Sequence, residues 1–178
     1  MAVSAPEDFQ FKLNFKTPKL EFNGKTDKQK AAMKKALTLG MQRGLNRVET
    51  SLSQALDRAM ESSSWGWTSR TTLRRNGSSV GSPRDIVDTG KLKDSKKLKT
   101  RFLQSGGSVA IEYGAPYAKL VHFGGAITPY GRKGRALVTL PARPWITATL
   151  EGGYGIEKFN ADEILNQAIS EAWQAQFG

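Results

Sequence analysis

The chain has 178 residues, with 27 Lys and Arg against 16 Asp and Glu, which gives a formal net charge of +11. It contains no Cys and a single His, so disulfides, thiolate chemistry and the usual structural zinc sites are excluded. No apolar run approaches the ~20 residues of a membrane span, and the start lacks the apolar segment of a signal peptide. We therefore expect a soluble protein made in a reducing cytoplasm, with no membrane partner.

The excess positive charge lies in the front part of the chain. Residues 1–110 hold 21 basic and 10 acidic side chains, whereas residues 111–178 hold six of each. From Glu151 onward, one basic side chain stands against five acidic ones. A basic front and an acidic end favour either a nucleic-acid partner or head-to-tail docking of identical subunits.

The N-terminal segment alternates between apolar and polar residues. Its apolar positions are Phe9, Phe11, Leu13 and Phe15. This spacing of two predicts a β-strand with one buried face, and Thr17-Pro18 interrupts it before the alternation resumes. A hairpin on the domain, an arm that adds to a neighbour's sheet and a terminal strand of the same domain are three open arrangements. We treat residues 1–25 as this arm or hairpin and residues 26–178 as a single α+β domain.

Residues 27–61 predict one long helix, because apolar side chains recur there at spacings of three and four. A helix of 35 residues would extend roughly 50 Å, longer than the ~40 Å diameter of a compact domain of this size. We therefore expect the helix either to project or to kink, with Gly40 and Gly44 as the weak points. Their spacing of four is also typical of a close crossing by another element.

The rest of the chain predicts short strands and helices. The expected elements are a loop over 62–86, a β-hairpin over 95–113 with its turn at 105–107, a short helical segment over 117–123, a strand over 136–140 and an amphipathic helix over 161–173. Asn160 and Glu163 are placed to cap the start of that last helix. The predicted fold class is α+β: a long N-terminal helix and a C-terminal amphipathic helix packed on a small antiparallel β-sheet.

Two patterns in the sequence are candidates for a catalytic site. Asp88-Thr89-Gly90 matches the tripeptide that carries the catalytic aspartate of dimeric aspartic proteases, but it also suits a simple turn, and Lys91 follows where a small residue is usual. His122 would need a nucleophile beside it, and no Gly-x-Ser-x-Gly elbow is present, so we expect a packed or interface histidine. We therefore predict no catalytic, cofactor-binding or metal-binding residues.

A basic stripe, Lys97, Lys99 and Arg101, lies on one face of the first hairpin strand. It could follow the phosphates of a nucleic acid, or it could be a solvated strand face that protects a sheet edge. Aromatic residues, which would stack on bases, are missing from this stretch.

Three segments, taken together, resemble a known family. They are Asp88-Thr89-Gly90-Lys91-Leu92 with Ser95, then Tyr113-Gly114-Ala115-Pro116-Tyr117-Ala118 running into Val121-His122-Phe123-Gly124, and then Leu140-Pro141-Ala142-Arg143-Pro144-Trp145-Ile146. Their order and spacing are similar to those of the tail-completion, or virion-morphogenesis, proteins of tailed bacteriophages. Trp145 stands where that family usually has Phe, and the Phe-rich segment at 8–23 lies outside the pattern.

Proteins of that family belong to the neck between head and tail, so the resemblance implies a structural virion protein and no enzyme activity. It implies a ring of identical subunits, often six, that completes the tail and joins it to the DNA-filled head. The implied partners are further copies of the chain, head connector or adaptor proteins, and tail-tube or tail-terminator proteins. Genomic double-stranded DNA would pass through the lumen without specific binding. The implied location is the virion neck, after synthesis in the cytoplasm of the bacterial host.

The motif residues are candidates for structural or interface roles. They are Asp88, Gly90, Leu92, Ser95, Tyr117, His122, Phe123, Gly124, Pro141, Arg143, Pro144 and Trp145. Because the two prolines fix φ on either side of Arg143, Arg143 and Trp145 would be held in set directions. They would then either anchor an interface or tie the last helix to the sheet. A basic nucleic-acid-binding module and, more remotely, a dimeric aspartic protease that uses Asp88 are the alternative functions.

Overall fold

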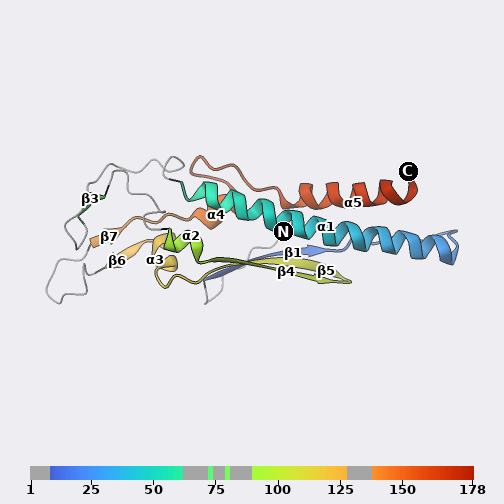
Figure 1. The fold of residues 1–178 in the computed structure, drawn as a ribbon, viewed down its shortest axis with the longest axis horizontal. Coiled ribbons are helices and arrows are strands. Elements are labelled where there is room, and N and C mark those ends of the chain that lie inside the picture. Colours follow the sequence, from blue (N-terminus) through green and yellow to red (C-terminus); the bar gives the residue numbers. More distant parts are fainter. Residues whose placement is uncertain (1–8, 62–71, 74–78, 81–89, 128–137) are drawn as a thin grey trace. The chain divides into compact units, whose positions relative to one another are not determined.

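The computed structural model of the chain has the predicted α+β class, with a long N-terminal helix, a C-terminal helix and a small antiparallel sheet (Figure 1). It describes residues 9–61, 72–73, 79–80, 90–127 and 138–178. Most of the predicted loop over 62–86, the first residues of the strand over 136–140, and Asp88 lie outside the described residues. No helix in the described part of the chain combines the length and apolar character that a membrane crossing needs.

The chain forms two compact units. One consists of residues 1–53, 98–112 and 160–178, and the other of residues 54–97 and 113–159.

The first unit holds most of a three-stranded sheet of order β1-β5-β4. The strands are β1 (Gln10–Lys16), β4 (Lys96–Leu103) and β5 (Gly106–Tyr113). β1 is antiparallel to β5, with Leu13 opposite Val109, so the N-terminal segment is a terminal strand of this sheet. The predicted hairpin over 95–113 is confirmed, but its turn is formed by Gln104 and Ser105, because Gly106 and Gly107 already belong to β5.

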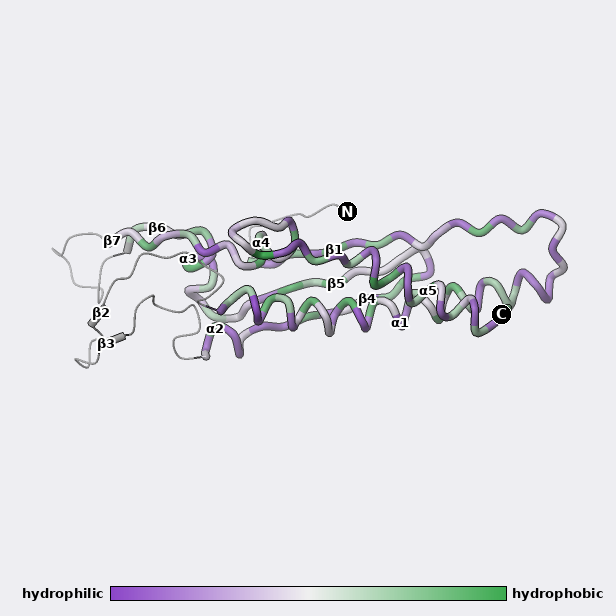
Figure 2. The backbone as a smooth tube through the Cα atoms, turned by 90° about the horizontal axis from the view of Figure 1, so that it is seen from above, coloured by the Kyte–Doolittle hydropathy of each residue, from purple (hydrophilic) through white to green (hydrophobic). Residues whose placement is uncertain are grey.

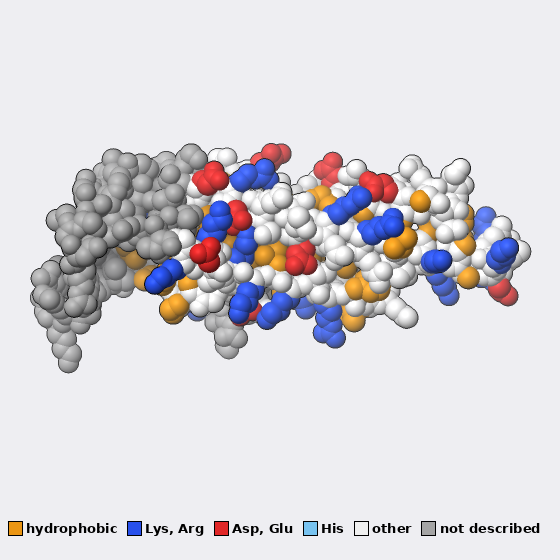
Figure 3. Space-filling view, viewed as in Figure 1, with side chains coloured by type: hydrophobic (Ala, Val, Ile, Leu, Met, Phe, Trp, Pro, Cys, Tyr) orange, Lys and Arg blue, Asp and Glu red, His pale blue; other side chains and the backbone are white. Residues whose placement is uncertain are grey.

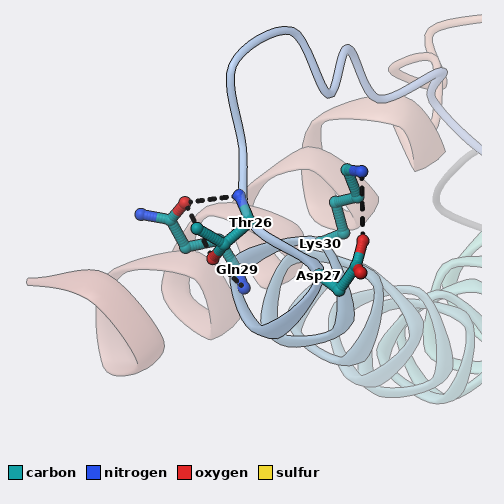
Figure 4. Close-up of polar contacts among 4 residues, drawn as sticks. All are labelled: Thr26, Asp27, Gln29 and Lys30. Carbon is teal, nitrogen blue, oxygen red and sulfur yellow. Dashed lines mark hydrogen bonds and ion pairs between the residues drawn. The ribbon is translucent and has the colours of Figure 1, made fainter.

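The long helix α1 (Asp27–Ala59) begins at a reciprocal side-chain cap, which Figure 4 shows. The backbone N–H of Thr26 donates to Gln29 Oε1 at 2.9 Å, and Thr26 Oγ1 accepts from the Gln29 N–H at 3.3 Å. An ion pair of 3.2 Å between Asp27 and Lys30 adds to this first turn (Figure 4). These bonds satisfy N–H groups that the start of a helix otherwise leaves unpaired.

The C-terminal helix α5 (Ala161–Phe177) confirms the predicted amphipathic helix and its cap. Asn160 Oδ1 accepts a hydrogen bond from the Glu163 N–H at 3.4 Å, and Asn160 Nδ2 donates to Glu163 Oε2 at 3.0 Å. The cap fixes where the helix starts and therefore which of its faces is apolar and buried.

α5 packs against α1 along Gly40 and Gly44 (Figure 1). A Cβ at Gly40 would lie 2.6 Å from Ile169 Cα, and one at Gly44 would lie 3.2 Å from Leu165 Cα. The two backbones come this close because glycine has no side chain. α1 is continuous through both positions, so these glycines admit a crossing helix rather than break their own.

Another face of α1 covers the sheet. Leu45 packs against Gly107 of β5, and Glu49 accepts a hydrogen bond from the Thr100 hydroxyl of β4. The apolar side chains of β1 that point toward this helix are buried. The first unit therefore has three layers, α5, α1 and the sheet, and Figure 2 shows hydrophobic and hydrophilic stretches alternating along both helices.

The second unit is built from short elements and the last residues of α1. They are β2 (Thr72–Leu73), β3 (Ser79–Val80), α2 (Lys91–Asp94), α3 (Ala118–Phe123), β6 (Gly125–Ile127), β7 (Val138–Leu140) and α4 (Trp145–Glu151). β2 pairs with β3 and β6 with β7, both antiparallel. α3 confirms the predicted helical segment over 117–123, whereas α4 was not predicted.

Candidate functional site

The three segments that carry the family resemblance are neighbours in the second unit. The Gly114 N–H donates to the Ser95 carbonyl at 3.0 Å, which joins the first segment to the second. The Arg143 N–H donates to the Val121 carbonyl at 3.0 Å, which joins the second segment to the third. We call the described residues of these segments, 90–95, 113–124 and 140–146, the motif cluster.

The first segment forms a turn and a short helix. Gly90 precedes α2 with a φ of +75°, a conformation that glycine adopts without steric cost. Leu92 is buried, and the Ser95 hydroxyl donates to the Leu92 carbonyl at 2.7 Å where α2 ends. The described residues of this segment thus have structural roles, and Asp88, on which the protease hypothesis depends, lies outside the described residues.

In the second segment, α3 divides its side chains between core and surface. His122 is fully buried, whereas Tyr117 and Phe123 are 39% and 53% exposed. Gly124 follows α3 with a φ of +71°, and a Cβ there would lie 2.7 Å from the backbone nitrogen of Ala142. Both the backbone conformation and the lack of space therefore require glycine at this position.

Trp145, from the third segment, is the centre of the cluster's core. Its side chain is fully buried, and its ring centroid lies 5.3 Å from that of Tyr113 and 4.9 Å from that of His122, both edge to face. Thr147 Oγ1 lies 3.2 Å from His122 Nε2. Trp145 therefore exposes no surface, and its ring contacts join α4 to α3 and to the end of β5.

The other residues of the third segment keep some exposed surface. Pro141 is exposed, and Arg143 and Pro144 are half-buried. Pro144 directly precedes α4, where its fixed φ suits the start of a helix. An interface role thus remains an expectation for Pro141 and Arg143, together with the exposed aromatic side chains of the second segment.

Burial sets the proton chemistry of the cluster. It lowers the pKa of His122 to about 4, so the imidazole is neutral at neutral pH and is a poor general base. Burial also raises the pKa of the Tyr113 phenol; the nearby Trp145 side chain opposes this shift, and the charge of Asp57 adds to it. Neutral, tightly packed aromatic groups of this kind suit a structural core.

A partly buried ion pair, which the sequence did not reveal, stands beside this core. Lys96 Nζ lies 2.6 Å from Asp57 Oδ1, and the Lys96 side chain is only 10% exposed. The pair joins the end of α1 to the first residue of β4. It could not be found from the sequence because its members are 39 residues apart and in different elements.

The basic stripe on β4 belongs to a wider charged surface. Lys97, Lys99 and Arg101 are exposed, as predicted, and Lys99 pairs with Glu112 of β5 at 3.0 Å. Glu112 lies opposite Gln10 of β1, so the alternate positions Lys12 and Lys16 share its side of the sheet, and both are exposed. We call Lys12, Lys16, Lys97, Lys99 and Arg101 the basic sheet face.

The described residues also form a shallow groove of about 430 Å³, between α1 and α5 of the first unit. It is lined by Asn46, Arg47, Thr50, Ser51, Ile164 and Gln167. Arg47 is already paired with Glu171 at 2.7 Å, so the groove offers little free charge. Within the described ranges, no three His, Asp or Glu side chains come together as a metal site would require.

Comparison with protein-family models, with curated proteins and with solved structures gives no match for this chain.

Proposed function

We propose that this chain is a structural subunit of the neck of a tailed bacteriophage, where its copies form a ring that completes the tail and joins it to the DNA-filled head. The observation that supports the proposal is the motif cluster, in which three segments far apart in the sequence are hydrogen-bonded to their neighbours.

The division of the cluster into core and surface also favours an assembly role. Its buried centre holds Trp145, His122 and Tyr113, which fix the fold of the segments. Tyr117 and Phe123 are left exposed, and exposed aromatic side chains are enriched in protein interfaces. In the proposed ring these residues contact a neighbouring copy, or a connector or tail protein.

Electron microscopy of the purified full-length chain tests this proposal. We expect closed rings with a central opening, and a specific antibody should label the junction of head and tail on virions that contain the chain. Phe123→Asp is expected to abolish the rings without unfolding the protein, as circular dichroism can verify. Lys119→Asp, on the same short helix, is the matched control and should leave the rings intact. A chain that stays monomeric at every concentration, with no antibody label at the neck, contradicts the proposal.

A further inference from the structure

We propose that the basic sheet face binds the phosphate backbone of duplex DNA, without sequence preference. The inference relies on the proposed neck function for the source of that DNA, the genome that passes through the ring. The binding itself depends only on the surface of one subunit, so it can be measured separately from ring formation.

The basic sheet face carries a largely uncompensated positive charge. Lys99 is bound to Glu112, but no acidic side chain among the described residues pairs with the other four cations. All five side chains are exposed, so no described element covers them. In Figure 3, Lys and Arg side chains project along the lower margin of the molecule, where Figure 1 places β4 and β5. Such a surface attracts a polyanion.

The cations stand in two rows that flank a row of small residues. Lys12 and Lys16 are on β1, and the other three are on β4. β5 lies between them, with Ser108 and Ala110 on the same side and Glu112, the partner of Lys99, at the end of the row. Since neighbouring strands are about 4.8 Å apart, the two rows are separated by about 10 Å. The grooves of B-DNA are about 6 and 12 Å wide, so the two rows can reach phosphates on both sides of one groove.

The composition of the face favours DNA over a second copy of the chain. Protein interfaces are depleted in Lys and enriched in aromatic residues, and this face has no aromatic side chain; its exposed apolar exception is Leu103, at the end of β4. The lack of aromatic stacking platforms also favours the backbone of a duplex over single-stranded bases.

Fluorescence anisotropy with a mixed-sequence duplex of about 30 base pairs tests the proposal. The face variant changes Lys12, Lys16, Lys97 and Arg101 to Gln in the full chain. The control variant changes Lys25, Lys28, Lys35 and Arg43 to Gln, which removes the same charge from exposed positions on or next to α1. Four phosphate contacts would give the wild type a slope of about −3.6 in log K against log salt. We expect the face variant to lose most of this slope and to bind at least about tenfold more weakly at ~0.1 M salt, with the control near wild type.

Four outcomes count against the proposal. Equal weakening of both variants means that net charge, not this face, attracts DNA. Absence of wild-type binding at low salt, or a strong preference for one duplex sequence, also overturns it. If the face variant binds DNA normally but no longer assembles, the face is an interface between copies. A wild-type chain that binds DNA through this face but never forms rings contradicts the neck function and leaves the present inference standing.

Discussion

Gly40 of α1 and Ile169 of α5 lie so close that a Cβ on Gly40 would be 2.6 Å from the Ile169 Cα. That separation is far below van der Waals contact, so the two helices meet backbone to backbone at this point. The missing side chain at Gly40 thus sets the distance between α1 and α5, and with it the position of α5 on the first unit.

Gly40→Ala is expected to destabilise the protein, although replacing Gly by Ala usually stabilises a helix. In an exposed helix, Ala is about 1 kcal/mol more favourable than Gly. Here the added methyl group forces the helices apart. We therefore expect the free energy of unfolding to fall by about 1–3 kcal/mol, the usual range for overpacking. Urea unfolding followed by circular dichroism measures the change. Thr38→Ala, at an exposed position of the same helix, should have almost no effect or a slightly stabilising one. A Gly40→Ala protein as stable as wild type would show that the close crossing does not exist.

Gly124→Ala tests how the second and third segments of the motif cluster fit together. Its control is Gly155→Ala, at a second glycine with a positive φ, +81° against +71° at Gly124. Gly124 also has a ψ of −179°, and this backbone region is open essentially to glycine alone. Gly155 has open space around it, whereas a Cβ at Gly124 would meet the backbone of Ala142 and Leu140. We therefore expect Gly124→Ala to cost about 1–3 kcal/mol more than Gly155→Ala in unfolding experiments. An equal loss in both variants contradicts the close packing of these segments.

The sequence predicted the elements whose side chains alternate between buried and exposed positions. α1, α5 and the β4–β5 hairpin all have this alternation, because one face of each is buried and the other is not. α4 is only seven residues long, and five of them are buried. Its two remaining residues, Thr147 and Glu151, stand four apart on one face, but two positions are too few to establish a helical period in the sequence.

The candidate site could be predicted only where its residues are close in sequence. The motif residues and the β4 stripe were found in this way, but the complete burial of Trp145 was not, since Trp and Arg also anchor interfaces. Lys12 and Lys16 join the stripe on one face only because β1 pairs with the far side of β5. No local pattern encodes that strand order, so two of the five cations of the basic sheet face could not be predicted.

The Asp57–Lys96 pair should be coupled more strongly than an exposed pair of the same chain. With the Lys96 side chain only 10% exposed, removing Asp57 leaves a poorly solvated charge. A double-mutant cycle with Asp57→Ala and Lys96→Ala is expected to give a coupling energy of about 1–2 kcal/mol. The same cycle at Asp27 and Lys30, whose side chains are 99% and 39% exposed, should give less than about 0.5 kcal/mol. Equal coupling in the two cycles would show that burial adds nothing to the Asp57–Lys96 interaction.

His122 should make the protein less stable in acid. Burial lowers its pKa to about 4 in the folded chain, against an ordinary value of 6.5 that applies when the chain is unfolded. Between these values the unfolded state binds the proton more readily, so stability is complete above pH ~6.5 and falls as the pH drops toward 4. The full decrease in the free energy of unfolding is on the order of 3 kcal/mol.

His122→Gln separates this effect from the titration of carboxylates. Gln keeps a side chain that can hydrogen-bond to Thr147, but it cannot take up a proton in this range. The variant will differ from wild type in absolute stability, so the informative quantity is how the difference in unfolding free energy changes with pH. Because the carboxylates titrate alike in both proteins, they cancel in that difference. We expect the unfolding free energy of the variant, relative to that of the wild type, to rise by an amount on the order of 3 kcal/mol as the pH is lowered from 7 to 4. If the difference in unfolding free energy stays constant over this pH range, burial among Trp145 and its neighbours does not hold the imidazole neutral.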